Sequence, residues 1–231
     1  MAVGRDGATA NGRGRGRARG RASDDGAAAG EAAATAPLSL RERNRLRTRQ
    51  TLLEAALEVF AERGFGSATV EAIAARAGAS KVTLYSYFPN GREELFREIY
   101  DGINSALLER AGQLRESRSG AVARVVALAE ALIEVAARPK IGRLYSIEDP
   151  ALEAALDPVR GHASAAYVRW IRVEIEQART EGRVGGMVDS ADLAELLVGA
   201  MRAALSGTAK EAGRASGMLR AFETLVSGVV A

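Results

Sequence analysis

From about Leu40 to the C-terminus the sequence repeats one pattern, in which apolar side chains recur three and four residues apart. That spacing gathers the apolar side chains on one face of an α-helix. The 231 residues include only five prolines, and no stretch alternates clearly between apolar and polar residues as a β-strand would. The pattern therefore predicts an all-α protein.

Glycines, prolines and capping residues divide this pattern into separate helices. On the first of them, one face carries Leu46, Leu53, Leu57 and Phe60, and Gly64 ends the helix. The predicted helices cover residues 46–63, 70–77, 80–87, 92–115, 121–137, 158–182 and 190–207, with a last one that contains Leu219 to Val229.

Three further signals set helix ends in the second half of the chain. Pro139 is expected to end the helix over 121–137, since proline cannot continue a helix. Asp157 and Pro158 are expected to begin the next helix as N-cap and first residue. Ser190 is expected to cap the one after it. Two of the C-terminal helices are apolar around much of their circumference, which predicts a thick bundle or a partner subunit.

The first 38 residues differ from the rest because they are mostly Gly, Ala, Arg, Asp and Ser. Such a segment buries too little apolar surface to offset the entropy of ordering it. Residues 1–49 carry 11 basic and 5 acidic side chains (+6), whereas residues 50–231 carry 21 and 24 (−3). A basic end on a nearly neutral body indicates an anionic partner such as nucleic acid, or a tail that only keeps the protein soluble.

The composition argues against several classes of function. The chain has no cysteine and a single histidine, His162, so disulfides, thiol catalysis and two-histidine metal sites are excluded. We expect no enzyme, no metal and no cofactor. No apolar run approaches the roughly 20 residues of a membrane span. We therefore expect no membrane partner and a cytoplasmic location.

Residues 45–96 form the most informative stretch, a helix followed by two short helices around a glycine turn. This order is that of a helix-turn-helix. Gly78 can adopt the positive φ that the turn needs, and Leu84 and Phe88 are predicted to face the core. The third helix then presents mainly hydroxyls and one lysine, as a helix that reads the major groove does. A hairpin of two helices in an ordinary bundle is the alternative.

The same stretch resembles the N-terminal domain of TetR-family (tetracycline-repressor-like) transcriptional regulators. The resemblance rests on the run from Thr69 to Pro89, on the preceding run from Ala55 to Phe65, and on the closing Glu93 to Phe96. It implies an all-α homodimer that binds a palindromic operator in double-stranded DNA. The composition predicts a disordered Arg/Gly-rich tail over 1–38, and the resemblance implies a helix-turn-helix DNA-binding domain over 39–91 and a helical ligand-binding and dimerisation domain over 92–231.

The resemblance also implies roles for individual residues. Phosphate contacts fix affinity and register, whereas base contacts give specificity. The candidates for contact with DNA are Arg45, Arg49, Thr69, Ser80, Lys81, Val82, Thr83, Tyr85, Tyr87 and Arg92.

Two positions depart from the family pattern. Val82 stands where the family often has glycine, and it can either touch a thymine methyl or be an indifferent surface residue. Asn90, Gly91 and Arg92 stand where the family often has a lysine, with one extra residue. Arg92 is expected to take over the phosphate contact of that lysine.

The function implied by these features is a transcriptional regulator, and specifically a repressor released from its operator by a small-molecule effector. The effector, its pocket and the operator sequence do not follow from the sequence. Leu197 and Met201 are the candidates for the dimer interface. The alternative function is a helical interaction module whose basic tail binds RNA or acidic proteins.

The tail carries one further hypothesis. Arg13, Arg15, Arg17, Arg19 and Arg21 occupy alternate positions of a glycine-rich stretch. An arm of this kind can enter the minor groove, where narrow A·T stretches attract arginine. The alternative is a leader that only adds solubility.

Overall fold

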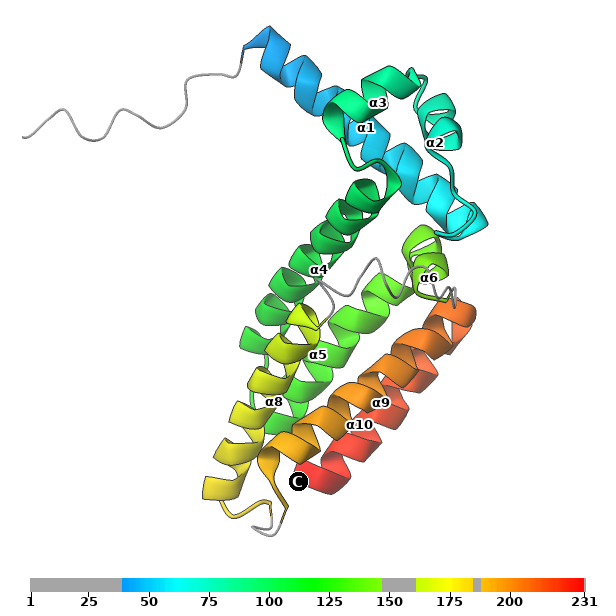
Figure 1. The fold of residues 1–231 in the computed structure, drawn as a ribbon. Helices are drawn as coiled ribbons and strands as arrows, with labels where there is room; N and C mark the ends of the chain where they lie inside the picture. Colours follow the sequence, from blue (N-terminus) through cyan, green and yellow to red (C-terminus); the bar gives the residue numbers. More distant parts are fainter. Residues whose placement is uncertain (1–38, 147–160, 185–187, 231) are drawn as a thin grey trace, which may run out of the picture. The chain divides into compact units, whose positions relative to one another are not determined.

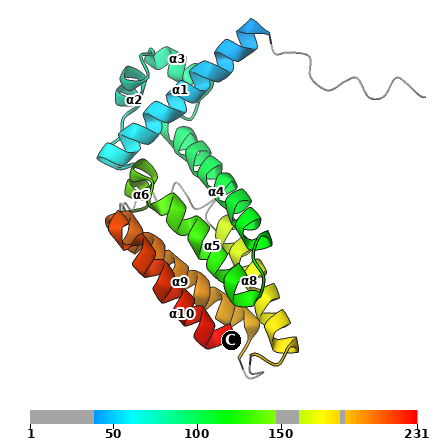
Figure 2. The same cartoon turned by 180° about the vertical axis from the view of Figure 1, so that it is seen from behind.

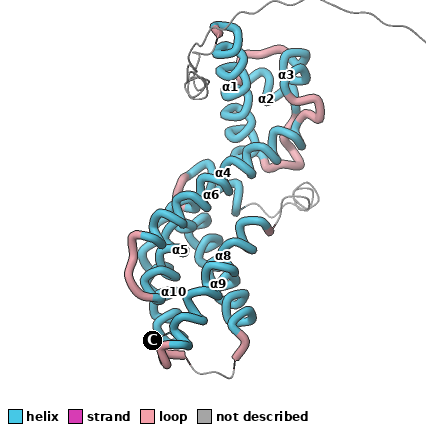
Figure 3. Tube along the Cα trace, turned by 90° about the vertical axis from the view of Figure 1, so that its left-hand side faces the viewer, coloured by secondary structure: helices cyan, strands magenta, loops and turns pink. Residues whose placement is uncertain are grey.

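The computed structural model of the chain describes residues 39–146, 161–184 and 188–230. Within these ranges the chain forms helices and no β-strand, so the predicted all-α fold is confirmed (Figure 3). The helices are α1 (Leu40–Arg63), α2 (Val70–Arg76), α3 (Lys81–Tyr87), α4 (Arg92–Glu116), α5 (Ala121–Ala136), α6 (Pro139–Ser146), α8 (His162–Thr180), α9 (Ser190–Lys210) and α10 (Ala215–Val230), with a 3₁₀ turn η1 (Ala212–Arg214) before the last.

One hydrophobic core joins α1, α2, α3 and the first half of α4. Its centre is an aromatic group in which Phe60 and Phe65 each meet Phe96 edge to face, with ring centroids 5.2 Å apart. Edge-to-face contact suits the charge distribution of aromatic rings and adds to the gain from burial. This core fixes how the two short helices lie against α1.

The buried face of α1 differs from the predicted one. The residues that face the core are spaced 3, 1, 3 and 1 apart: Leu52, Ala55, Ala56, Val59 and Phe60. Of the predicted face, only Phe60 is buried, whereas Leu53 and Leu57 are half-buried and Leu46 is 54% exposed. The prediction chose the face with the most large side chains, whereas the buried face combines Leu52, Val59 and Phe60 with two small alanines.

Helix α1 also begins earlier than predicted, at Leu40 instead of residue 46. Residues 40–47 are mainly arginine, leucine and glutamate, which have high helix propensity. Gly64 ends the helix as predicted, with φ of 78° and its amide donating to the Phe60 carbonyl (2.9 Å).

A second core is built around α5, which contacts α4, α8, α9 and α10 (Figures 1 and 2). Helix α5 is buried on most sides, because Val125, Leu128, Ala129, Ala131 and Val135 are all at most 4% exposed. Alanines at this density let the surrounding helices pack close to its axis. The thick bundle predicted for this part of the chain is therefore present.

A buried carboxylate ties three helices of the bundle together. Glu174 on α8 is fully buried and accepts hydrogen bonds from Arg115 on α4 (2.6 Å) and Arg124 on α5 (3.4 Å). Its near neighbour Glu176 is exposed, so the two carboxylates face opposite sides of α8. A buried charge of this kind is tolerated only while its partners remain in place.

Helix α6 was not predicted. Helix α5 does end just before Pro139, but the proline then begins a new helix, since its fixed φ suits the first helical turn. Two contacts of α6 reach the first core: Leu144 is buried in it, and Lys140 pairs with Glu58 of α1 (2.5 Å). On its other side α6 packs against α9.

Two of the predicted helix ends concern the start of α8 and the start of α9. Asp157 and Pro158 lie outside the described residues, and the described part of α8 begins at His162, which is exposed. The N-cap of α9 is Asp189, whose carboxylate accepts from the Ala191 amide (2.7 Å), and Ser190 is the first helical residue. Asp and Ser are both good caps, and the prediction was one residue off.

No helix in the described ranges has the length and apolar character needed to cross a bilayer. Within the same ranges, no three histidine or acidic side chains come together as a metal site would require.

The packing of α6 generates a stability prediction. A Cβ atom on Gly142 would lie 2.3 Å from the Ala136 carbonyl oxygen and 3.5 Å from Ala209 Cα. Gly142→Ala should therefore destabilise the fold by about 1–3 kcal/mol, since backbone atoms cannot yield. Gly112→Ala is the matched control, because nothing lies within 4 Å of its Cβ and alanine is the better helix former. Thermal or urea unfolding of both variants checks this, and equal midpoints would contradict it.

Candidate nucleic-acid interface

Helices α2 and α3 and the turn between them form a helix-turn-helix. Both short helices have side-chain N-caps: Thr69 Oγ1 accepts from the Ala72 amide (3.2 Å), and Ser80 Oγ accepts from the Thr83 amide (3.0 Å). In the turn, Gly78 has φ of 65°, as predicted, and the Ala79 amide donates to the Ala74 carbonyl (2.9 Å). Nothing crowds Gly78, so its positive φ is the reason for glycine there.

Helix α3 turns one face to the core and one to solvent. Leu84 and Phe88 are fully buried, as predicted. The opposite face exposes Lys81, Val82, Tyr85 and Ser86, with Val82 80% and Tyr85 41% exposed. An aliphatic side chain this exposed on a seven-residue helix contributes little to the core.

The exposed face of α3 holds one internal ion pair. Lys81 Nζ contacts the carboxylate of Glu71 on α2. The hydrogen bond between them raises the pKa of Lys81 and lowers the pKa of Glu71. Both side chains are more than half exposed, so solvent weakens the pair and an incoming anion can compete for the lysine.

The two predicted arginines of α1 have different surroundings. Arg45 is exposed. Arg49 is half-buried: its guanidinium pairs through both nitrogens with the carboxylate of Glu98 on α4 and lies 4.9 Å from the ring centroid of Phe88. A bidentate, stacked arginine of this kind holds α1, α3 and α4 together. The structure therefore gives Arg49 a structural role.

Arg92 is also engaged within the protein. Its Nη1 lies 3.1 Å from the Gly66 carbonyl oxygen and 3.2 Å from that of Ala68. Its guanidinium also stacks on the Phe65 ring, 4.9 Å from the centroid. These contacts close the loop between α1 and α2 against the start of α4, so the side chain predicted to replace the family lysine is used as a clamp.

The extra residue before α4 has a local explanation. Gly91 has φ of 61°, and a Cβ atom there would lie 3.3 Å from both the Tyr85 ring and a methyl of Val70. Glycine is thus required twice, for backbone conformation and for space. Glu94 completes the turn by accepting from the Asn90 amide (2.9 Å). Tyr87, the second predicted tyrosine, is half-buried.

The structure adds a feature that the sequence analysis missed. A hollow of about 380 Å³ lies between α1 and the turn before α3. Hydroxyl and guanidinium groups surround it, from Arg47, Thr48, Thr51, Ser80 and Thr83. The sequence shows how the basic residues are spaced along α1. The approach of α1 to Ser80, however, depends on tertiary packing.

The remaining predicted residues lie elsewhere. Leu197 and Met201, predicted for a dimer interface, are 3% and 1% exposed and belong to the core of the single protomer. The exposed apolar residue of the same helix is Leu196, at 71%. The five tail arginines, Arg13 to Arg21, lie outside the described residues.

Comparisons with known proteins agree with this geometry. Residues 52–99 match the family described as "Bacterial regulatory proteins, tetR family". A Bacillus subtilis protein, the HTH-type transcriptional regulator YhgD, is 32% identical over 68 residues, which are 29% of this chain and 35% of that protein. The matched region thus spans about a third of that relative's length.

Two solved structures share the fold. A TetR-family regulator from Pectobacterium atrosepticum superposes with a TM-score of 0.61 at 23% identity, over 84% of this chain and 98% of that one. The regulator FadR from Bacillus subtilis, in complex with stearoyl-CoA, gives 0.63 at 14% identity, over 77% and 97%. The matched helix-turn-helix and the shared helical fold lead to one conclusion: residues 52–99 form a DNA-binding region of the TetR-family type, and the described helices have the fold of the two solved regulators.

Proposed function

We propose that the protein is a homodimeric repressor that binds a palindromic operator in double-stranded DNA and releases it when a small molecule binds the bundle. The observation that carries this proposal is the exposed face of α3, where Lys81, Val82 and Tyr85 project from a helix anchored by two fully buried side chains. The family and the fold indicate a regulator instead of an enzyme, and such a protein would act in the cytoplasm.

The residues predicted to contact DNA fall into groups according to the contacts that they make within the domain. Thr69 and Ser80 use their hydroxyls as helix caps, and Arg49 and Arg92 are held inside the domain. Base contacts would then fall to Val82, Thr83 and Tyr85. Phosphate contacts would come from Lys81, from Arg45 and from the hollow beside Arg47.

Dimerisation would use α8 and α9, which lie side by side (Figure 1). Together they expose Val173 (55%) and Leu196 (71%). The exposed surface of α8 also carries Arg169 and Arg172, and that of α9 carries Asp192 and Glu195. A two-fold axis places each patch against its copy, so basic α8 would meet acidic α9 of the partner around an apolar centre.

The effector would enter a pocket of about 370 Å³ between α4, α5, α8 and α9. A regulator of this fold, Bacillus subtilis FadR, is known in complex with stearoyl-CoA, which supports a ligand site in the bundle. Binding would favour a spacing of the two α3 helices other than the roughly 34–36 Å that successive major grooves require. Only such a difference in affinity between two states can release DNA.

The first test concerns the α3 face, with duplexes selected from a random pool by the full-length protein. Lys81→Ala should weaken binding and reduce the slope of log affinity against log salt by about 0.9, because one phosphate fewer is neutralised by the protein. Glu71→Gln should strengthen binding, because it frees Lys81 and removes a negative charge from the surface. Fluorescence anisotropy at several salt concentrations measures both.

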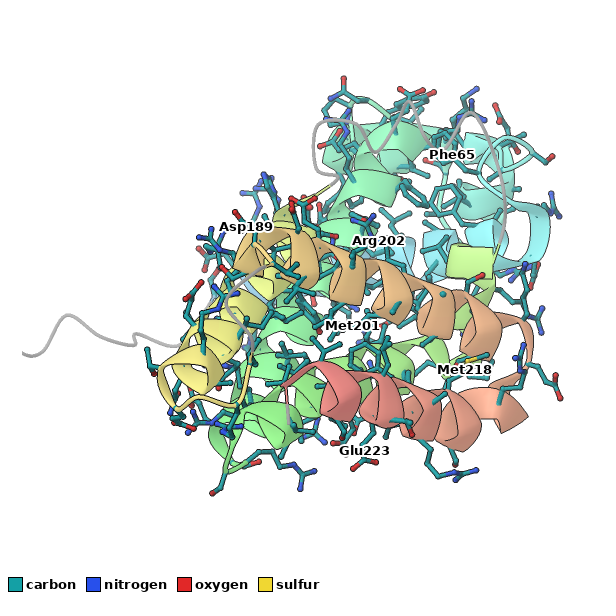
Figure 4. The ribbon with its side chains drawn as sticks, turned by 90° about the horizontal axis from the view of Figure 1, so that it is seen from below. Phe65, Asp189, Met201, Arg202, Met218 and Glu223 are labelled. Atoms are coloured by element: carbon teal, nitrogen blue, oxygen red, sulfur yellow. The ribbon has the colours of Figure 1, made fainter. Side chains whose placement is uncertain are left out.

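Glu223→Gln on α10 is the control, since it makes the same change in net charge on an exposed bundle helix (labelled in Figure 4). It should leave the affinity within about twofold of wild type, a difference of about 0.4 kcal/mol. Wild-type affinity and base preference in a triple Lys81, Val82, Thr83 alanine variant would refute the assignment of α3.

The second test uses two adjacent leucines of α9. Leu196→Glu should yield a folded monomer, because its side chain is exposed in the protomer. Leu197→Glu should lower the stability by about 3 kcal/mol or more, since it buries an unpaired charge in the core. Sedimentation velocity and thermal unfolding separate the two effects. A monomeric wild type at micromolar concentration, or a Leu196→Glu variant that still dimerises, would rule out this interface.

A further inference from the structure

The pocket in the bundle combines a polar level with apolar lining. Its lining comes from Tyr100, Asn104 and Leu107 of α4, Leu132 of α5, Gly161 together with Ala163, Ser164 and Tyr167 of α8, and Val198, Met201, Arg202 and Leu205 of α9. Helix α9 runs antiparallel to α8, to which a short connection joins it (Figure 1). Residues at the same height along the pocket, called a level here, therefore follow opposite sequence orders on α8 and α9.

Three helices place a polar residue at the same level of the pocket. On α4, Asn104 lies one turn nearer to Arg92 than Leu107 does. On α8, Ser164 precedes Tyr167 by one turn. On α9, which runs the other way, Arg202 follows Val198 by one turn.

A hydrogen bond fixes the alignment of two of these helices, because Arg202 donates to Ser164 Oγ (2.8 Å). The level of the pocket that contains this bond is polar, and Tyr100 and Leu205 lie beyond it. The next level on the other side, with Leu107, Tyr167 and Val198, is apolar and largely buried.

The described residues of the polar level carry one positive charge and no negative charge. Arg202 is the charged residue among the described lining residues, and none of those residues is acidic. Elsewhere in the bundle, arginines that lie against neighbouring helices are matched by carboxylates, as Arg110 is by Glu134 and Arg115 by Glu174. Arg202 instead meets a neutral hydroxyl, and within the described residues no carboxylate pairs with it. Figure 4 shows Arg202 beside Met201 on α9.

We infer that the effector of the proposed repressor is an amphipathic monoanion, with a carboxylate or similar acidic group at Arg202 and Ser164 and an apolar body between Leu107, Tyr167 and Val198. This inference rests on the proposed function and deepens it by naming the ligand class. A carboxylate can accept two parallel hydrogen bonds from a guanidinium, and such charge-assisted bonds are about twice as strong as neutral ones. An apolar body gains free energy when it is buried at the level of Leu107, Tyr167 and Val198.

The test measures ligand binding without DNA, using two pairs of probes that differ only in charge. One pair is octanoate and octan-1-ol, and the other is 4-phenylbutanoate and 4-phenylbutan-1-ol. Isothermal titration of the full-length protein should show at least one acid binding more tightly than its alcohol by about tenfold or more, the effect of one charge-assisted hydrogen bond. The affinity for these probes should be measurable whether or not the protein also binds a specific DNA duplex.

Arg202→Gln should abolish the preference for the acid, because it weakens the binding of the acid much more than that of the alcohol. Arg220→Gln, at an exposed position of α10 outside the pocket lining, makes the same charge change and should keep the preference. Thermal unfolding of both variants shows whether they remain folded. Equal affinities for acid and alcohol, no binding of any probe, or an unchanged preference in Arg202→Gln would overturn the inference.

The design separates this inference from the proposed function. Preferential binding of the acid by a protein that selects no duplex would leave the ligand class standing and refute the repressor. Specific DNA binding without any preference for the acid over the alcohol would support the repressor and refute the ligand class.

Discussion

Helix α4 is the element on which the other parts of the described structure depend, because it belongs to both hydrophobic cores. Its first turns bury Leu95, Phe96 and Ile99 against the helix-turn-helix, and its later turns bury Leu107 and Ala111 in the bundle. Ile103, between them, packs against both cores. A continuous helix transmits displacement along its axis, since its hydrogen bonds leave little freedom within it. Any change at the pocket, which α4 lines through Tyr100, Asn104 and Leu107, therefore acts on a helix that also supports α3.

Helix α6 provides a second connection between the same two cores. Leu144 is buried in the first core and Lys140 pairs with Glu58, which in turn pairs with Arg76 of α2 (3.1 Å). Arg76 also binds Glu62 (2.7 Å), and these hydrogen bonds raise the pKa of the guanidinium. The ion pairs are partly exposed and add little stability by themselves. Their geometric effect is to align α2 with α1, and through α1 with α6.

The arginines of the protein illustrate how packing decides the role of a charged side chain. Arg45, Arg49 and Arg92 all suit phosphate contact by their type and their place in the family pattern. In the fold, Arg49 and Arg92 stack on Phe88 and Phe65 and satisfy groups of the domain itself, whereas Arg45 stays exposed. Guanidinium groups combine a flat apolar face with five donors, so they serve equally well as clamps and as anion ligands. Which role applies depends on the neighbours, and those come from distant parts of the chain.

The sequence by itself determined the features whose partners lie within a few residues. The caps at Thr69 and Ser80, the glycines at 64 and 78 and the burial of Leu84 and Phe88 follow from hydrogen bonds and periodicity inside one or two turns. Tertiary structure alone decided the features whose partners are far away. Arg49 meets Glu98, Arg115 meets Glu174, and Leu197 is buried while Leu196 is exposed. The physical reason is that several faces of an alanine-rich helix are apolar enough to be buried, and only the approach of neighbouring helices selects among them.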